Sequence, residues 1–78
     1  MDPRTPKSPA DRLWTLAKGQ RRFTCQLRSH GTYGWECQFF EGGELIASRR
    51  FPMRAQAIEW ATAERIEHES EGWTLATL

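Results

Sequence analysis

The apolar residues of segments 23–27 and 35–39 mirror each other across Gly31. Counting outward from this glycine pairs Leu27 with Trp35, Cys25 with Cys37, and Phe23 with Phe39. Side chains of a strand alternate between the two faces of a sheet, so residues two apart share a face. This match therefore predicts an antiparallel hairpin that turns at residues 30–32 and buries one face. It also predicts that the two cysteines lie directly opposite each other.

Turn residues and alternating apolar residues predict further elements on both sides of this hairpin. Residues 12–17 are either a short first strand or a loop before a turn at 18–20. Further strands are expected at 21–29, 33–40 and 44–51. Pro52 is expected to end the last strand and open a helix at 53–70, because proline is tolerated in the first helical turn. Gly72 is expected to cap this helix, with Trp73 folding back on its last turn.

The turn at Gly42 and Gly43 admits two registers between its strands. A two-residue loop would put Phe51 on the polar face and Arg50 in the core. A loop of three residues, 41–43, keeps the apolar face continuous, and we prefer it for that reason. The pairs in that register are Phe39 with Leu45, Cys37 with Ala47, and Tyr33 with Phe51.

These elements predict an α+β fold, in which one C-terminal helix packs on one face of a three- to four-stranded antiparallel meander. The order is ββββα, or βββα if residues 12–17 are a loop. A chain of 78 residues holds one small domain, expected at 12–73. Residues 1–11 are rich in proline and are expected to form a disordered arm, with a recognition arm as the alternative. Residues 74–78 form a tail whose packing the sequence leaves open.

Basic residues gather in the first two-thirds of the chain. Residues 1–54 carry ten Lys or Arg and five Asp or Glu, whereas residues 55–78 carry one Arg and five Glu. The chain is therefore electrically two-sided along its sequence. It has no apolar run of about 18 residues, and its first nine residues lack the apolar centre of a secretory signal. We expect a cytoplasmic protein without a membrane span, in which both cysteines are reduced, with a cross-strand disulfide between them as the alternative.

One face of the predicted sheet lies away from the helix and is expected to be open to solvent. Its Arg and Gln side chains suit contacts with phosphates and base edges of nucleic acids. The residues expected to make such contacts are Arg28, Arg50, Gln26, Gln38, Arg21 and Arg22. Phe40 and Ile46 are apolar on the same face, so the alternative is a contact with a protein partner or with a second copy.

The sequence offers no pattern typical of catalysis, a metal site or a cofactor site. The two histidines and two cysteines lack the spacings of metal ligands. A cysteine on the core face of a strand lacks the base that a nucleophile needs. Gly42 and Gly43 form a hairpin end rather than a phosphate-binding loop. We therefore expect a protein that is not an enzyme, with no cofactor and no small-molecule substrate.

The stretch 34–64, GWECQFFEGGELIASRRFPMRAQAIEWATAE, carries a resemblance to known DNA-binding domains. It has a Trp-bearing strand, a Gly-containing hairpin, a strand that ends in Phe, and a helix with Ala and Trp three residues apart. This layout resembles the AP2 domain and the arm-type DNA-binding domain of phage integrases. The resemblance implies a sheet that reads the DNA major groove, with roles for Arg28, Arg50, Gln26 and Gln38. Glu36 and Glu44 depart from that pattern, because they place acids on the implied DNA face.

The chain also resembles short uncharacterised bacterial proteins with the pattern WxL…GW…F/LxxGEL…F…A, for which no function is implied. We expect a small binding module that contacts DNA or RNA through the open sheet face, with help from Arg4 and Lys7 of the arm. The alternative is a protein-interaction or self-associating domain that uses Phe40 and Ile46 or an unpaired strand edge.

Overall fold

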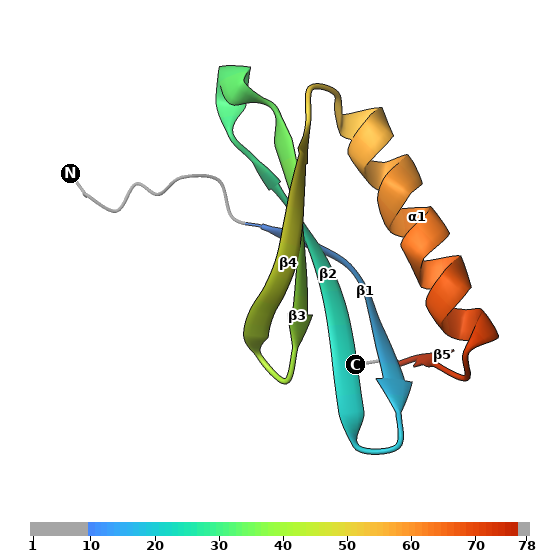
Figure 1. The fold of residues 1–78 in the computed structure, drawn as a ribbon. Coiled ribbons are helices and arrows are strands. Elements are labelled where there is room, and N and C mark those ends of the chain that lie inside the picture. The colour runs from blue at the N-terminus through green and yellow to red at the C-terminus, as the bar shows by residue number, and fades with distance from the viewer. Residues whose placement is uncertain (1–9, 77–78) are drawn as a thin grey trace.

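A computed structural model describes residues 10–76 of the chain. The elements in order are β1 (Asp11–Lys18), β2 (Arg21–Ser29), the short 3₁₀ helix η1 (Gly31–Tyr33), β3 (Trp35–Glu41), β4 (Glu44–Phe51), α1 (Arg54–Ser70) and β5 (Thr74–Leu75). The strands form one antiparallel sheet in the order β4-β3-β2-β1-β5, and α1 packs on one side of it (Figure 1). The α+β class and the single helix after a meander are confirmed. Residues 1–9 of the predicted arm lie outside the described residues.

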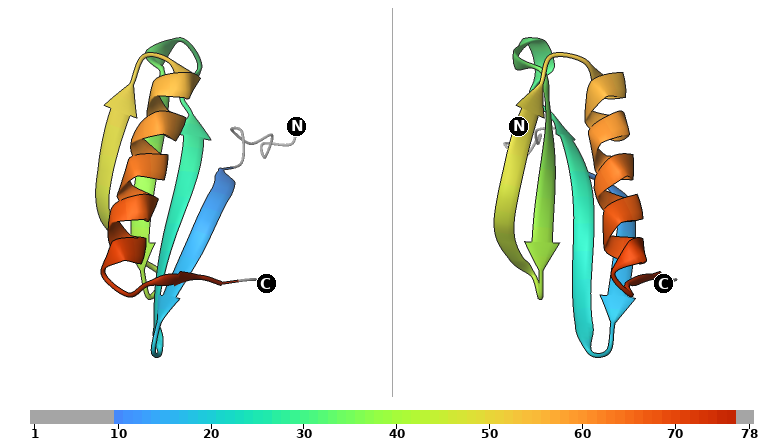
Figure 2. Two further views of the ribbon diagram at one scale, coloured as in Figure 1. Left: turned by 90° about the vertical axis from the view of Figure 1, so that its right-hand side faces the viewer. Right: turned by 45° about the vertical axis from the view of Figure 1, so that its right-hand side comes forward.

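The sheet has five strands rather than the three or four that we expected. Residues 12–17 do form a strand, as part of β1. The additional strand is β5, which leaves the end of α1 and pairs with β1 at Leu16 and Ala17. Part of the C-terminal tail therefore belongs to the sheet, where it covers one end of the β1 edge (Figure 2).

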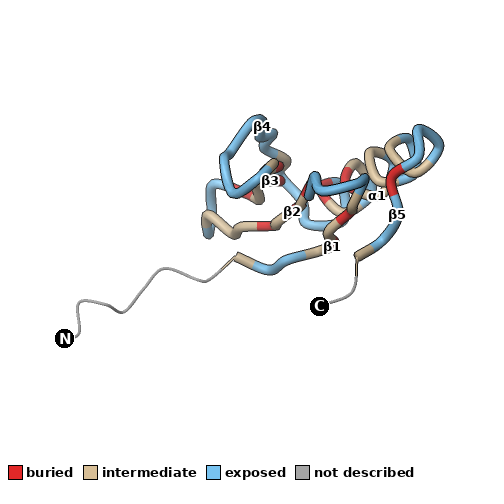
Figure 3. The backbone as a smooth tube through the Cα atoms, turned by 90° about the horizontal axis from the view of Figure 1, so that it is seen from below, coloured by how far each residue is buried: buried red, intermediate tan, exposed pale blue. Residues whose placement is uncertain are grey.

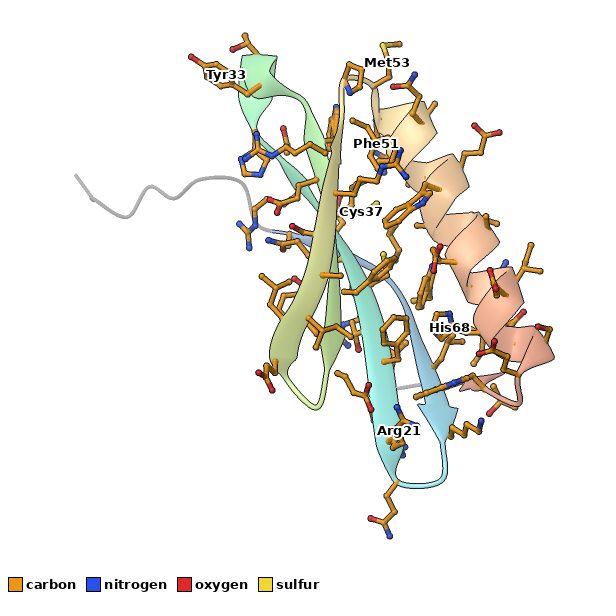
Figure 4. The ribbon with its side chains drawn as sticks, viewed as in Figure 1. Arg21, Tyr33, Cys37, Phe51, Met53 and His68 are labelled. Atoms are coloured by element: carbon orange, nitrogen blue, oxygen red, sulfur yellow. The ribbon has the colours of Figure 1, made fainter. Side chains whose placement is uncertain are left out.

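The core lies between α1 and the sheet face that α1 covers. Alternate residues of the inner strands point into it, as the period-2 pattern predicts, and the small side chains of Ala57 and Ala61 let the helix approach closely. Figure 4 shows Cys37, Phe51 and His68 in this layer. The buried residues are Trp14, Leu16, Phe23, Cys25, Leu27, Cys37, Phe39, Ala57, Ala61 and Trp73.

The predicted register of the first hairpin is wrong by two residues. The observed pairs are Ser29 with Trp35, Leu27 with Cys37, Cys25 with Phe39 and Phe23 with Glu41. The reason is the longer loop, in which η1 forms and the His30 N–H donates to the Gly34 carbonyl at 2.8 Å. A slip of two residues leaves every side chain on its predicted face. The two cysteines are therefore both buried but not directly opposite, and both are free thiols.

The second hairpin has a two-residue loop, so the predicted three-residue loop is wrong. Gly42 and Gly43 both have positive φ, at 61° and 87°, which a tight turn of this kind requires. Phe40 then pairs with Leu45, but Phe39 pairs with Ala47, so Ile46 is an extra residue in β4. The two-residue loop alone would turn Phe51 to the polar face. The extra residue in β4 shifts the alternation of side chains by one, so Phe51 still faces the core.

Two residues of the predicted apolar face, Tyr33 and Leu45, lie at the surface instead, and so does the residue expected to begin the helix. Tyr33 is 80% exposed because it belongs to η1 rather than to β3, and Figure 4 shows it pointing away from the sheet. Leu45 is 49% exposed because the bulge places it opposite Phe40. Met53 is 59% exposed because α1 begins one residue later, at Arg54.

The predicted end of the helix is confirmed. The N–H of Gly72 donates to the Glu69 carbonyl and the N–H of Trp73 to the His68 carbonyl, both at 3.2 Å, which satisfies two of the last free carbonyls. The ammonium group of Lys18 on β1 donates a hydrogen bond to the Glu71 carbonyl, with Nζ 2.8 Å from the oxygen. The Trp73 ring returns to the core, where it packs against Phe23. The turn after α1 thus fixes both the helix and the start of β5.

Candidate nucleic-acid interface

The sheet face opposite α1 is built from three rows of cross-strand neighbours on β2, β3 and β4. The first row holds Arg28, Glu36 and Arg50, the second Gln26, Gln38 and Ser48, and the third Thr24, Phe40 and Leu45. None of these side chains is buried, whereas their alternate neighbours on β2 and β3 are core residues. The open face is thus a continuous polar surface with one aromatic ring, and it brings together Gln26, Arg28, Gln38, Phe40 and Arg50 as predicted.

Glu36 is the electrostatic centre of the first row. Its carboxylate accepts a hydrogen bond from Nε2 of His30 at 2.7 Å. Partial burial raises the pKa of Glu36, but hydrogen bonds from His30 and Ser48 and the nearby charge of Arg50 outweigh it, so the pKa is lowered. Glu36 is therefore ionised at neutral pH and lies in register with Arg28 on one side and Arg50 on the other.

The second row contains a buried acceptor whose hydrogen-bonding capacity is unused. Within residues 10–76, the side-chain carbonyl oxygen of Gln38 is shielded from solvent and accepts no hydrogen bond. Such an atom costs about 1–3 kcal/mol of stability. Native structures leave few buried polar atoms in this state, and each calls for an explanation. Gln38 lies between Gln26 and Ser48, so it marks the centre of the polar face.

The third row carries the apolar part of the face. Phe40 is half-buried between Thr24 and Leu45, and Thr24 also shares a 3.0 Å hydroxyl contact with Thr15 of β1. Ile46, which we predicted beside Phe40 on this face, is the bulge residue of β4 and is 52% exposed. The structure adds Leu45 to this group. The sequence did not predict Leu45 on this face because the predicted three-residue loop assigned it to the core.

Arg21 and Arg22 do not lie on the same face. Arg22 shares the parity of Arg28, and its guanidinium donates to the backbone carbonyls of Gly19 and Arg21. Arg21 lies on the helix side, where its guanidinium carbon is 4.9 Å from the Trp73 ring centroid. It also forms a 2.7 Å ion pair with Glu41, which lowers the pKa of that carboxyl. Arg21 therefore closes the rim of the core.

The structure places a further cation on the open face. Arg12 pairs with Gln26, although Trp14 two residues later pairs with Cys25 on the core side. The extra residue between them is Leu13, so a bulge reverses the parity of β1 at this point. A strict alternation from Trp14 assigns Arg12 to the core face, which is why sequence reasoning missed it.

Charge is divided between the two layers of the molecule. By cross-strand register, the described open face carries Arg12, Arg22, Arg28 and Arg50 against Glu36. The helix layer carries Glu59, Glu64, Glu67, Glu69 and Glu71 against the cations Arg54 and Arg65. Arg65 is bound to Glu69 at 3.0 Å and so offsets one of these acids. The asymmetry that the sequence shows along the chain is therefore also an asymmetry across the sheet.

Among residues 10–76, no three His, Cys, Asp or Glu side chains gather where they could hold a metal ion. His68 instead stacks on Phe23 with ring centroids 4.4 Å apart, and its Nδ1 lies 2.8 Å from the Glu64 carbonyl. In the described part of the chain, no helix is long and apolar enough to cross a membrane.

The comparisons with known proteins add no relative. The chain matches no protein-family model, no curated protein and no solved structure. The open face is therefore interpreted from its own residues, geometry and charge.

Proposed function

We propose that this protein is a small non-enzymatic module that binds single-stranded nucleic acid on its open sheet face. The observation that carries the proposal is the composition of that face: four arginines against one glutamate, a central row of amides and a hydroxyl, and one accessible aromatic ring. Arginines bind phosphates, amides read base edges, and an aromatic ring offers a stacking surface for a base.

The shape of the face favours a single strand over a duplex. The face is a sheet surface with an accessible aromatic ring, and unstacked bases can lie against it. Phe40 lies four residues along β3 from Glu36, which corresponds to roughly 13 Å of strand. That length lets one strand contact both the arginine row and the aromatic ring.

The buried oxygen of Gln38 supports the same proposal. An unpaired acceptor lowers stability, and such costs are commonly retained where a residue serves binding. A base amino group is a donor of the type that this amide can accept once its side chain turns outward.

Fluorescence anisotropy with labelled oligothymidine, oligouridine and a duplex at 50 mM salt tests this function. Single strands should bind more tightly than the duplex, and affinity should fall steeply between about 50 and 200 mM salt. Arg28→Gln combined with Arg50→Gln should weaken binding by roughly tenfold or more, because two phosphate contacts are lost. Arg54→Gln combined with Arg65→Gln removes two positive charges from the helix layer and serves as the control.

Binding that is absent at low salt, or that the double variant leaves unchanged, would overturn the proposal. Equal losses in the open-face double variant and in the helix double variant would also contradict it. That result would mean that net charge, rather than the open face, determines affinity.

A second function is favoured by the apolar side chains at the edge of the same face. Leu45 and Ile46 are about half exposed and adjoin Phe40, so a second copy is the proposed partner. Sedimentation at high concentration tests it. Self-association that Phe40→Ser abolishes would support this function, whereas a strict monomer would exclude it.

A further inference from the structure

The free edge of β4 is the longest run of unpaired backbone in the described sheet. β4 is the end strand of the sheet, and every residue of it except Phe51 is exposed (Figure 3). In an end strand, every second residue directs its N–H and C=O away from its neighbour. At the opposite end of the sheet, β5 covers part of the β1 edge. An additional strand would therefore find most of its partners along β4.

An open groove of about 590 Å³ lies next to this edge, between β4 and α1. Phe51 and Trp60 lie in it with ring centroids 5.6 Å apart. Gln56, Glu59 and Ala63 line its helix side. Figure 2 shows α1 lying over the middle of the sheet and leaving β4 at the margin. Side chains of a strand added to β4 would enter the groove at every second position and cover these rings.

Arg49 is held over the groove by both aromatic rings. Its guanidinium carbon lies 5.1 Å from the Phe51 centroid and 5.4 Å from the Trp60 centroid. Stacking uses the faces of the guanidinium plane and leaves the N–H donors at its rim available. Those donors match a carboxylate in the fork geometry that Arg prefers. Arg50, the next residue, places a second positive charge on the other face of the same edge.

We propose that the β4 edge binds an extended segment of a partner protein in which pairs of acidic and pairs of apolar residues alternate, so that each face of the added strand carries both kinds. Backbone hydrogen bonds would attach the segment to β4 by strand addition. Its apolar residues would cover Phe51 and Trp60, and its carboxylates would bind Arg49 and Arg50. The groove carries Arg49 and Arg50 against Glu59, and this net positive charge selects an acidic partner.

The same charge disfavours a second copy as the occupant. Antiparallel pairing of two β4 strands about Ser48 or Arg49 brings four arginines together. Pairing about Ala47 sets Glu44 opposite Arg50, but the bulge at Ile46 places these two residues on opposite faces. Bulges and charges are the usual devices that protect a free edge from self-pairing.

The test uses a fluorescein-labelled, end-blocked octapeptide with the sequence Glu-Glu-Val-Val repeated twice, and the corresponding Lys-Lys-Val-Val octapeptide is the matched probe. The Glu peptide should bind and the Lys peptide should bind at least about tenfold more weakly. Two further peptides carry N-methyl groups, one on its odd-numbered amides and the other on its even-numbered amides. One of them should lose binding, because only alternate amides face β4. Amide resonances of Ser48, Arg49 and Phe51 should shift on binding of the Glu peptide.

Arg49→Gln should weaken the Glu peptide by about tenfold, since a charged hydrogen bond is lost. Arg22→Gln, on the open face, is the matched control and should leave the peptide affinity unchanged. Equal binding of the Glu and Lys peptides, or full binding by both N-methylated peptides, would overturn the proposal. So would a dimer in sedimentation that Arg49→Gln strengthens, because the edge would then pair with itself.

This inference does not depend on the nucleic-acid function. Arg49 lies on the helix side of β4 and Arg28 on the open face. Loss of peptide binding in Arg49→Gln with oligonucleotide binding intact would support the edge proposal alone. The opposite pattern would contradict it.

Discussion

The thiol of Cys37 on β3 donates a hydrogen bond to the backbone carbonyl of Ala57 on α1, with Sγ 3.2 Å from the oxygen. This bond joins the sheet to the helix at a position where both residues are fully buried. It explains how α1 approaches the sheet so closely, since a thiol opposite an alanine leaves little volume between the two backbones.

Cys37→Ala is expected to lower the free energy of unfolding by about 1–2 kcal/mol, because it removes both a donor and a buried sulfur. Cys37→Ser keeps a donor and tests the hydrogen bond separately from the volume. Urea denaturation measures both variants. A Cys37→Ala protein as stable as the parent would show that the contact contributes nothing to stability.

Both cysteines should be unreactive in the folded protein. Burial raises the pKa of Cys25 and of Cys37, so little thiolate forms near neutral pH. Ellman's reagent should therefore modify them slowly in buffer and rapidly in urea. Fast modification of either thiol under native conditions would contradict the buried placement.

Gly34 and Gly31 provide a matched pair of turn substitutions. Both have positive φ, but a Cβ on Gly34 would lie 2.5 Å from the carbonyl oxygen of Phe51, whereas a Cβ on Gly31 meets nothing within 4 Å. Gly31→Ala should cost roughly 1 kcal/mol of backbone strain. Gly34→Ala should cost at least about 3 kcal/mol, since the backbone of the neighbouring segment must also move. Thermal denaturation should rank them in that order, and the reverse order would refute the loop geometry.

Glu36 should make stability depend on pH at the acid end. Its pKa is lowered in the folded state from an ordinary 4.5, so it contributes stability above that pH. The contribution is lost as pH falls through the lowered value. Glu36→Gln should reduce stability at pH 7 by about 1 kcal/mol and flatten the acid limb of the stability curve. Glu44→Gln, at the exposed hairpin end, removes the same charge without touching the His30 contact and is the matched control.

Gln38→Val separates stability from binding. The substitution removes the buried unpaired oxygen and adds a residue that favours strands, so the melting temperature should rise. Oligonucleotide binding should weaken in the same variant. A variant that gains stability and keeps full affinity would mean that the amide has no binding role.

Much of the architecture could be predicted because a register error of two residues leaves each side chain on its predicted face. The slip in the first hairpin was two residues, so Leu27, Cys25 and Phe23 kept their predicted face. The bulges at Leu13 and Ile46 could not be predicted, because the pattern of apolar residues does not show where a bulge lies. Those two residues decide where Arg12 and Leu45 lie.

The candidate site was less predictable than the fold. The row of Arg28, Glu36 and Arg50 lies on one face only if the registers of both hairpins are correct to within an even number of residues. Arg21 is not on the open face, because neighbours on a strand point to opposite faces and Arg22 occupies the open side. Trp73, at the rim of the core, gives Arg21 its actual contact.

The separation of acids on the helix layer from cations on the open face gives the molecule an electric dipole moment across its thickness. Beside a polyanion, such a moment experiences a torque that turns the open face forward before any contact forms. The effect reaches about 8 Å at physiological ionic strength. Neutralising the helix acids would then change the association rate constant, while the dissociation rate constant would stay the same.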